Sequence, residues 1–180
     1  MIRLLFIILL LGVLLAAPAQ AAPTDPMRGL IWGLPPEAVQ EHETAHFVAA
    51  RDGRFFYLDE VRVDADYRVK ALVEFRFTDQ GLAGIRYDFV MEDGRDPYVT
   101  MERLMKMEAW LNDAIGTPAN PDFYFRNALE RAHSSRWGWA LYRGDATFDF
   151  RWRAADTDIV LSARGREWKG HASLSLSRLP

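Results

Sequence analysis

The chain has no cysteine among its 180 residues. Disulfides, thiol nucleophiles and cysteine-linked lipids are therefore excluded. The sequence also lacks a glycine-rich phosphate-binding loop and a Gly-x-Ser-x-Gly nucleophile elbow. These absences remove the sequence signatures of several large enzyme classes.

The chain carries little net charge, and the sign of that charge is wrong for nucleic acid. Lys and Arg number 22 against 25 Asp and Glu, which gives a formal net charge of −3. Binding to a polyanion needs a concentrated basic surface, so we expect no nucleic-acid partner. No low-complexity tract, Gly/Ser linker or long run of like charge occurs, and residues 22–180 are predicted to form one domain.

One long apolar run is present, at residues 4–15, shortly after a basic start. Ala19 and Ala21 supply the small side chains that a signal peptidase reads. The pattern predicts a signal peptide at residues 1–21, with cleavage between Ala21 and Ala22. An uncleaved anchor would need about 20 apolar residues, and this run is shorter. We therefore expect a periplasmic or secreted protein with no stable membrane span after signal cleavage.

Alternation of apolar and polar residues predicts a central antiparallel hairpin from Tyr67 to Met91. The turn is placed at Asp79-Gln80-Gly81, and Leu72 is the one apolar residue on the polar side. One face of this hairpin should be exposed to solvent, and the other should carry five aromatic rings that helices must cover. The rings are those of Tyr67, Phe75, Phe77, Tyr87 and Phe89.

A helix is predicted from Pro97 to the glycine at 116, with Asp96 as its N-cap. Its apolar stripe is expected to lie on the aromatic face of the sheet, away from solvent. The stripe consists of Met101, Leu104, Met107, Leu111 and Ile115.

Downstream, a short helix is predicted at residues 127–133, and a second meander of about four strands follows. Its strands are placed at 137–141, 148–153, 159–161 and 171–177 because alternation returns there. The predicted fold is α+β. It has an antiparallel sheet of about seven to eight strands in two meanders, with two or three helices packed on one face.

The one chemical motif is His42-Glu43-Thr44-Ala45-His46, which satisfies H-E-x-x-H. On a helix, His42 and His46 would share a zinc ion and Glu43 would deprotonate the metal-bound water. Five residues here thus resemble the zincin metallopeptidases. A third ligand would be needed, and the available acids, Glu60 and Glu74, fall in predicted strands.

The segment that holds this motif has two interpretations. A helix that starts at Pro35 and Pro36 could continue to Arg51. Alternatively, residues 45–50 could form a strand that pairs with residues 54–63 across the Asp52-Gly53 turn. Only the first interpretation places the two histidines on one helical face.

Four stretches of the chain form a recognisable pattern. They are Trp32-Gly33 with Glu37-Ala38-Val39, then Phe75-Arg76-Phe77 with Leu82 and Tyr87-Asp88-Phe89, then Gly116-Thr117-Pro118, and finally Trp152 with Thr157-Asp158-Ile159-Val160-Leu161. Together these stretches resemble a group of exported bacterial proteins, many of them lipoproteins, without assigned activity. The resemblance implies a strand after the first helix, which favours ending that helix near Glu43, and it supplies no catalytic residue. The chain departs from the lipoprotein members by lacking the anchoring cysteine.

We therefore predict a non-catalytic binding or interaction protein of the cell envelope, without catalytic residues, cofactor or metal. Its partner would be an envelope protein, a peptide or a small apolar ligand. The candidate contacts are residues around Trp32 and the loops Glu92–Asp96 and Thr117–Pro121. A ligand pocket between the long helix and the sheet is a further possibility. The alternative is a small zinc-dependent metallohydrolase that uses His42, His46 and Glu43.

Overall fold

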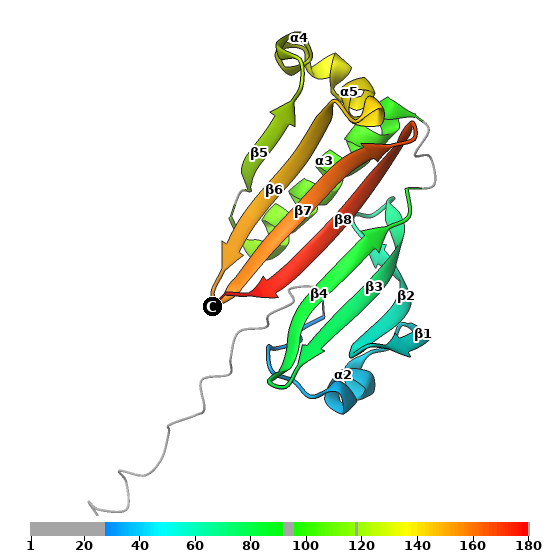
Figure 1. The fold of residues 1–180 in the computed structure, drawn as a ribbon, viewed down its shortest axis with the longest axis vertical. Helices are drawn as coiled ribbons and strands as arrows, with labels where there is room; N and C mark the ends of the chain where they lie inside the picture. Colours follow the sequence, from blue (N-terminus) through cyan, green and yellow to red (C-terminus); the bar gives the residue numbers. More distant parts are fainter. Residues whose placement is uncertain (1–27, 92–95, 118, 180) are drawn as a thin grey trace, which may run out of the picture.

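A computed structural model describes residues 28–91, 96–117 and 119–179. The predicted signal peptide and residues 92–95 of one candidate contact loop lie outside the described residues. In chain order the elements are α2 (Pro36–His42), β1 (His46–Arg51), β2 (Arg54–Arg62), β3 (Arg68–Thr78), β4 (Gly81–Phe89), α3 (Pro97–Ile115), β5 (Asn120–Phe125), α4 (Ala128–Ala132), the 3-10 turn η1 (Ser134–Arg136), α5 (Trp137–Arg143), β6 (Ala146–Ala154), β7 (Thr157–Arg166) and β8 (Lys169–Arg178) (Figure 1).

All eight strands belong to one antiparallel sheet, in the order β1-β2-β3-β4-β8-β7-β6-β5. Each meander runs β1 to β4 or β5 to β8, and the two are joined through their last strands, β4 and β8. The predicted α+β class with two meanders in an antiparallel sheet is confirmed.

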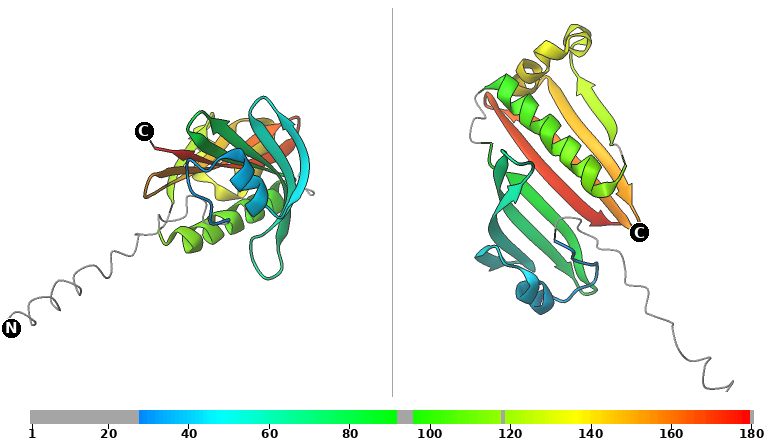
Figure 2. Two further views of the ribbon diagram at one scale, coloured as in Figure 1. Left: turned by 90° about the horizontal axis from the view of Figure 1, so that it is seen from below. Right: turned by 180° about the vertical axis from the view of Figure 1, so that it is seen from behind.

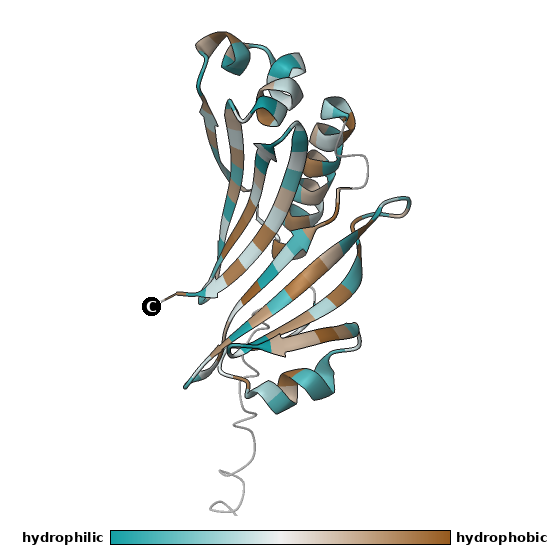
Figure 3. Cartoon of the chain, turned by 45° about the vertical axis from the view of Figure 1, so that its right-hand side comes forward, coloured by the Kyte–Doolittle hydropathy of each residue, from teal (hydrophilic) through white to brown (hydrophobic). Residues whose placement is uncertain are grey.

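The sheet has a covered face and an open face. Figure 2 shows α3 lying across the back of β6, β7 and β8, while the strands face the viewer in Figure 1. We call the helix side the inner face and the opposite side the outer face. Apolar and polar bands alternate along the strands in Figure 3, because successive side chains leave opposite faces of the pleat.

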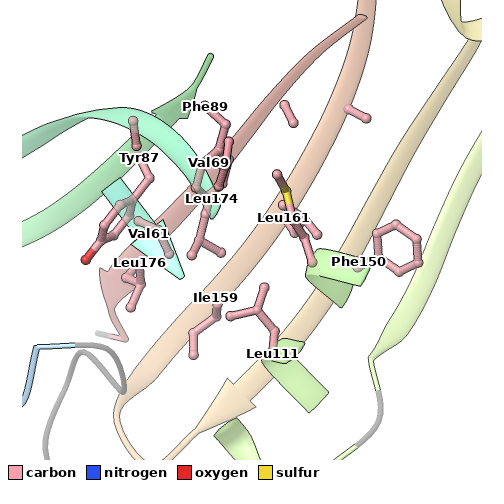
Figure 4. Packing of buried hydrophobic residues seen from close by; sticks show 14 of the residues in the cluster. Val61, Val69, Tyr87, Phe89, Leu111, Phe150, Ile159, Leu161, Leu174 and Leu176 are labelled. Atoms are coloured by element: carbon pink, nitrogen blue, oxygen red, sulfur yellow. The ribbon is translucent and has the colours of Figure 1, made fainter. Parts of the chain in front are cut away.

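The core is continuous across the seam between the two meanders. Tyr87 and Phe89 of β4 lie beside Leu174 and Leu176 of β8, and all four are at most 6% exposed (Figure 4). Leu111 of α3 packs over Ile159 and Leu161 of β7 in the same view. The two meanders therefore share one hydrophobic core.

Helix α3 begins and ends where the sequence predicts. The carboxylate of Asp96 accepts hydrogen bonds from the backbone N–H groups of Tyr98 and Val99, and Gly116 ends the helix with a φ of 79°. Glycine adopts that left-handed conformation without the steric cost that a Cβ atom brings. Leu104, Met107 and Leu111 of the predicted stripe are buried, while its two terminal members are half-buried.

One predicted strand is wrong, because residues 137–143 form helix α5. Trp137 and Leu141 are four residues apart and lie on the sheet side of this helix, whereas Trp139 is 43% exposed. A Cβ atom on Gly138 would lie 2.3 Å from the carbonyl oxygen of Pro97, so a glycine is needed where α5 crosses α3. The first strand of the second meander is instead β5.

The predicted short helix at 127–133 is confirmed as α4, whose N-cap Asn127 accepts a hydrogen bond from the backbone N–H of Leu129. With α5 added, the described residues form four α-helices.

Candidate functional site

The chain from Arg28 to Leu34 crosses the inner face and is fastened to the start of β4. The backbone N–H of Gly33 donates to the carbonyl oxygen of Leu82 (3.0 Å), and the N–H of Leu82 donates to the carbonyl oxygen of Leu34 (2.8 Å). This pairing fixes the segment, and it sets Arg28 over the aromatic side chains of the sheet.

The guanidinium of Arg28 is the centre of a buried polar network. Its Nε donates to the Tyr87 hydroxyl (2.8 Å) and its Nη1 to Glu43 Oε1 (2.9 Å), while Nη2 donates to Asp59 Oδ2. The same group lies 5.3 Å from the ring centroid of Tyr87 and 6.0 Å from that of Phe75. A planar fork of five donors suits such a site, because one group serves two carboxylates and stacks on rings.

The charges in this network perturb one another. Burial alone would lower the pKa of Arg28, but Tyr87, Glu43 and Asp59 outweigh it and raise that pKa above its ordinary value. Burial and the negative charge of Glu43 raise the pKa of Tyr57. Glu43 is the most deeply placed acid, with 2% of its side chain exposed. Its Oε1 also accepts a hydrogen bond from the N–H of Ala45 (2.8 Å), whereas Oε2 has no partner in the described parts of the chain.

A groove of about 370 Å³ opens beside this network. We call it the α3–β2 groove, because β2 forms one wall and the last turns of α3 form the other. Trp110 on α3 is half-buried, and no described residue accepts a hydrogen bond from its indole N–H. The groove thus offers an aromatic wall with an unused donor, and Arg28 and Asp59 of the buried network form part of its lining. Its lining residues are Arg28, Asp59, Glu60, Val61, Arg62, Tyr87, Trp110 and Ala114.

The His42–His46 motif does not lie on one helix. Helix α2 ends at His42, Glu43 is its C-cap with extended backbone angles, and His46 begins β1. The strand interpretation of residues 45–50 is therefore correct, and the helix ends near Glu43. The four-residue helical spacing that would aim both imidazoles at one zinc ion is absent from this segment.

Each member of the motif has a structural position instead. His42 donates from Nε2 to the carbonyl oxygen of Arg28 (2.8 Å), and Glu43 faces the Arg28 guanidinium. His46 pairs with Leu58 on the outer face, where Glu60 and Glu74 also lie. Within residues 28–91, 96–117 and 119–179, no three His, Cys, Asp or Glu side chains gather where they could hold a metal ion.

The other candidate contacts are only partly described. The indole N–H of Trp32 donates to the Thr157 hydroxyl (3.0 Å), so this residue ties the N-terminal segment to β7. Residues 92–95 and 118 of the two candidate loops lie outside the described residues. Over the part of the chain that is described, no helix combines the length and apolar character needed to cross a bilayer.

Sequence reasoning missed the Arg28 network. One signal was available: Asp59 follows Phe55 and Tyr57 at an inner position of an alternating strand. A carboxylate at such a position needs a buried partner, although the alternation does not say which cation supplies it.

Comparisons with protein-family models, with curated proteins and with solved structures found no match for this chain. The resemblance to exported bacterial proteins therefore stays a prediction.

Proposed function

We propose that the protein is a non-catalytic binding domain exported to the cell envelope, and that its binding site is the α3–β2 groove. The groove carries the proposal, because it combines an aromatic wall, an unused indole donor and a rigid polar floor. Small-molecule sites combine apolar surface with a few fixed polar groups that orient the ligand. Here Val61, Trp110 and Ala114 supply apolar surface, and the Arg28 network supplies the fixed polar groups. A volume of about 370 Å³ suits a small amphipathic molecule or the side chains of a short peptide segment.

The charged floor is suited to holding a ligand and not to reacting with it. The Arg28 guanidinium already bonds two carboxylates and a phenol, so it is rigid and pre-organised. Asp59 and Tyr87 in the groove lining already accept hydrogen bonds from Arg28, which favours a ligand-positioning role for these two groups over a reactive one. Export rests on the predicted signal peptide and is tested by the mass of the secreted chain, which should begin at Ala22.

The binding proposal is tested by filling the groove from α3. Ala114 lines the groove, whereas Ala109 is exposed on another side of the same helix. Ala114→Trp should block the site, and Ala109→Trp is the matched control. The probes are indole, octanoate and a short apolar peptide, followed through the Trp110 indole N–H signal by ¹H–¹⁵N NMR.

We expect at least one probe to move the Trp110 signal saturably in the wild type and in Ala109→Trp, and none to do so in Ala114→Trp. The proposal fails if every probe leaves the Trp110 signal in place. It also fails if Ala114→Trp, still folded by circular dichroism, responds as the wild type does.

A further inference from the structure

The outer face of the first meander carries a row of arginines at directly paired positions. Arg51 of β1 pairs with Arg54 of β2, and Arg54 pairs with Arg76 of β3. Like charges placed directly across a ladder destabilise a sheet. The row occurs in a chain whose net charge is −3, so it is not the product of a generally basic composition.

Few acids compensate this row. Glu74 Oε1 lies 3.1 Å from Arg54 Nη1 and 3.9 Å from Arg76 Nε, so one carboxylate serves two guanidinium groups. Arg51 meets Asp52 at 3.7 Å, but both side chains are largely exposed. Exposed pairs of this kind contribute little.

The same face shows a balanced cluster elsewhere. Arg164 reaches Asp149 with contacts of 2.8 and 2.9 Å, and Ser162 donates to the same carboxylate. Arg151 lies between Asp149 and Asp122. Two acids therefore serve two arginines there, whereas the Arg51–Arg54–Arg76 row has a surplus of positive charge.

A depression lies beside the row, and we call it the Arg54–Arg76 depression. It has a volume of about 420 Å³ and is lined by Asp52, Gly53, Arg54, Arg76, Phe77, Thr78, Ala83 and Ser177. The Arg76 guanidinium lies flat across Gly84, where a Cβ atom would come within 2.8 Å of its Nη2. Gly84 thus lets Arg76 lie along the sheet surface, on the same side as the Thr78 and Ser177 hydroxyls.

We infer that the Arg54–Arg76 depression binds an oxyanion, the phosphate or carboxylate group of a soluble molecule or of a lipid headgroup. Guanidinium groups form paired, charge-assisted hydrogen bonds with such groups, and the Ser177 hydroxyl adds a further donor. A bound oxyanion also relieves the repulsion between Arg54 and Arg76. The site lies on the opposite face of the sheet from the α3–β2 groove, so it does not depend on the proposed function.

The test uses inorganic phosphate against chloride at equal ionic strength, followed by ¹H–¹⁵N NMR at Gly84, Ser177 and the arginine Nε–H groups. A second arm measures sedimentation with phosphatidylcholine vesicles, with and without phosphatidylglycerol. Arg76→Gln should weaken binding about tenfold, the effect of losing one charge-assisted hydrogen bond. Gly84→Ala keeps the charge but displaces Arg76, and it should weaken binding as well. Arg153→Gln, an exposed arginine elsewhere on this face, is the matched control.

A variant that binds phosphate more tightly is a sharper test than one that binds it less, because misfolding can weaken binding but does not strengthen it. Glu74→Gln removes the competing carboxylate and should strengthen phosphate binding about fivefold. Asp88→Asn, which removes an acid paired with Arg86 outside the depression, should leave it unchanged.

Binding of phosphate without binding to vesicles identifies the ligand as a soluble anion. Binding only to the vesicles that contain phosphatidylglycerol identifies it as a lipid headgroup. Either result supports the inference if Arg76→Gln reduces the observed binding. The inference is overturned if neither arm shows saturable binding. It is also overturned if Arg153→Gln weakens binding as much as Arg76→Gln does.

Discussion

A single side chain, Arg28, joins parts of the chain that are distant in sequence. Its partners Glu43, Asp59 and Tyr87 are 15, 31 and 59 residues away. The arginine side chain is 12% exposed and that of Glu43 is 2% exposed, so neither charge is stabilised by bulk water. Each is therefore tolerated in the interior because the other is present.

Removal of the Arg28 guanidinium should show how far the buried charge of Glu43 depends on it. We expect Arg28→Met to lower the free energy of unfolding by about 3–5 kcal/mol, because Glu43 is left buried without a counter-charge. Urea denaturation measures the change. The double variant Arg28→Met/Glu43→Gln should recover part of the loss, because the stranded charge is removed.

The control for this prediction is Arg153→Met, which makes the same substitution at an exposed position on the outer face. It should change stability by no more than about 0.5 kcal/mol. Equal effects of Arg28→Met and Arg153→Met would show that the buried network does not stabilise the fold.

At the scale of one element, α5 shows how an ambiguous pattern is resolved. Trp137, Trp139 and Leu141 alternate with smaller residues, as in a strand, yet residues 137 and 141 are also one helical turn apart. In the structure the segment is helical and packs closely on β7, because Gly165 has no side chain: a Cβ atom there would lie 1.5 Å from the carbonyl oxygen of Leu141. Gly144 then ends the helix with a φ of 74°.

The helix and the strand predict different mutational costs for this segment. In α5, Leu141 is fully buried and Trp139 is exposed. We expect Leu141→Ala to destabilise by about 2–5 kcal/mol, and Trp139→Ala by about 0.5 kcal/mol or less. Thermal and urea denaturation of both variants provide the measurement. A strand would place both side chains on one face, so similar large losses would contradict the helical assignment.

At the scale of the whole molecule, the two meanders depend on one another. The pairing of β4 with β8 closes the sheet, and Trp32 from the N-terminal segment bonds to Thr157 in the second meander. Helix α3 follows the first meander in sequence but packs on the second, where Asn112 accepts a hydrogen bond from the Trp152 indole N–H (2.9 Å). Neither half has a complete core of its own.

We therefore expect a single cooperative unfolding transition, with equal calorimetric and van't Hoff enthalpies in differential scanning calorimetry. Leu174→Ala, at a fully buried position on β8, should lower the midpoint of that one transition for both halves. Leu58→Ala, at an exposed position on β2, is the control and should leave the midpoint nearly unchanged. Two resolved transitions in the variant would contradict a shared core.

Several elements could be predicted from the sequence because their signals are local. Period-two alternation predicts the hairpin of β3 and β4, and Asp96 with Gly116 bounds the long helix. Those signals depend on pleat geometry and on unpaired backbone groups at helix ends, which neighbouring residues satisfy. Strand β5, with Pro121 and Asp122 inside it, has no comparable pattern and was missed.

The candidate sites were decided by the tertiary structure. The sequence by itself determined which faces of the strands are apolar, and hence an α+β domain with a shared core. It could not pair Arg28 with Glu43 and Asp59, nor align Arg51, Arg54 and Arg76 across three strands. Charges interact through space and not along the chain, so their partners are defined only when strand register and the path of the N-terminal segment are fixed.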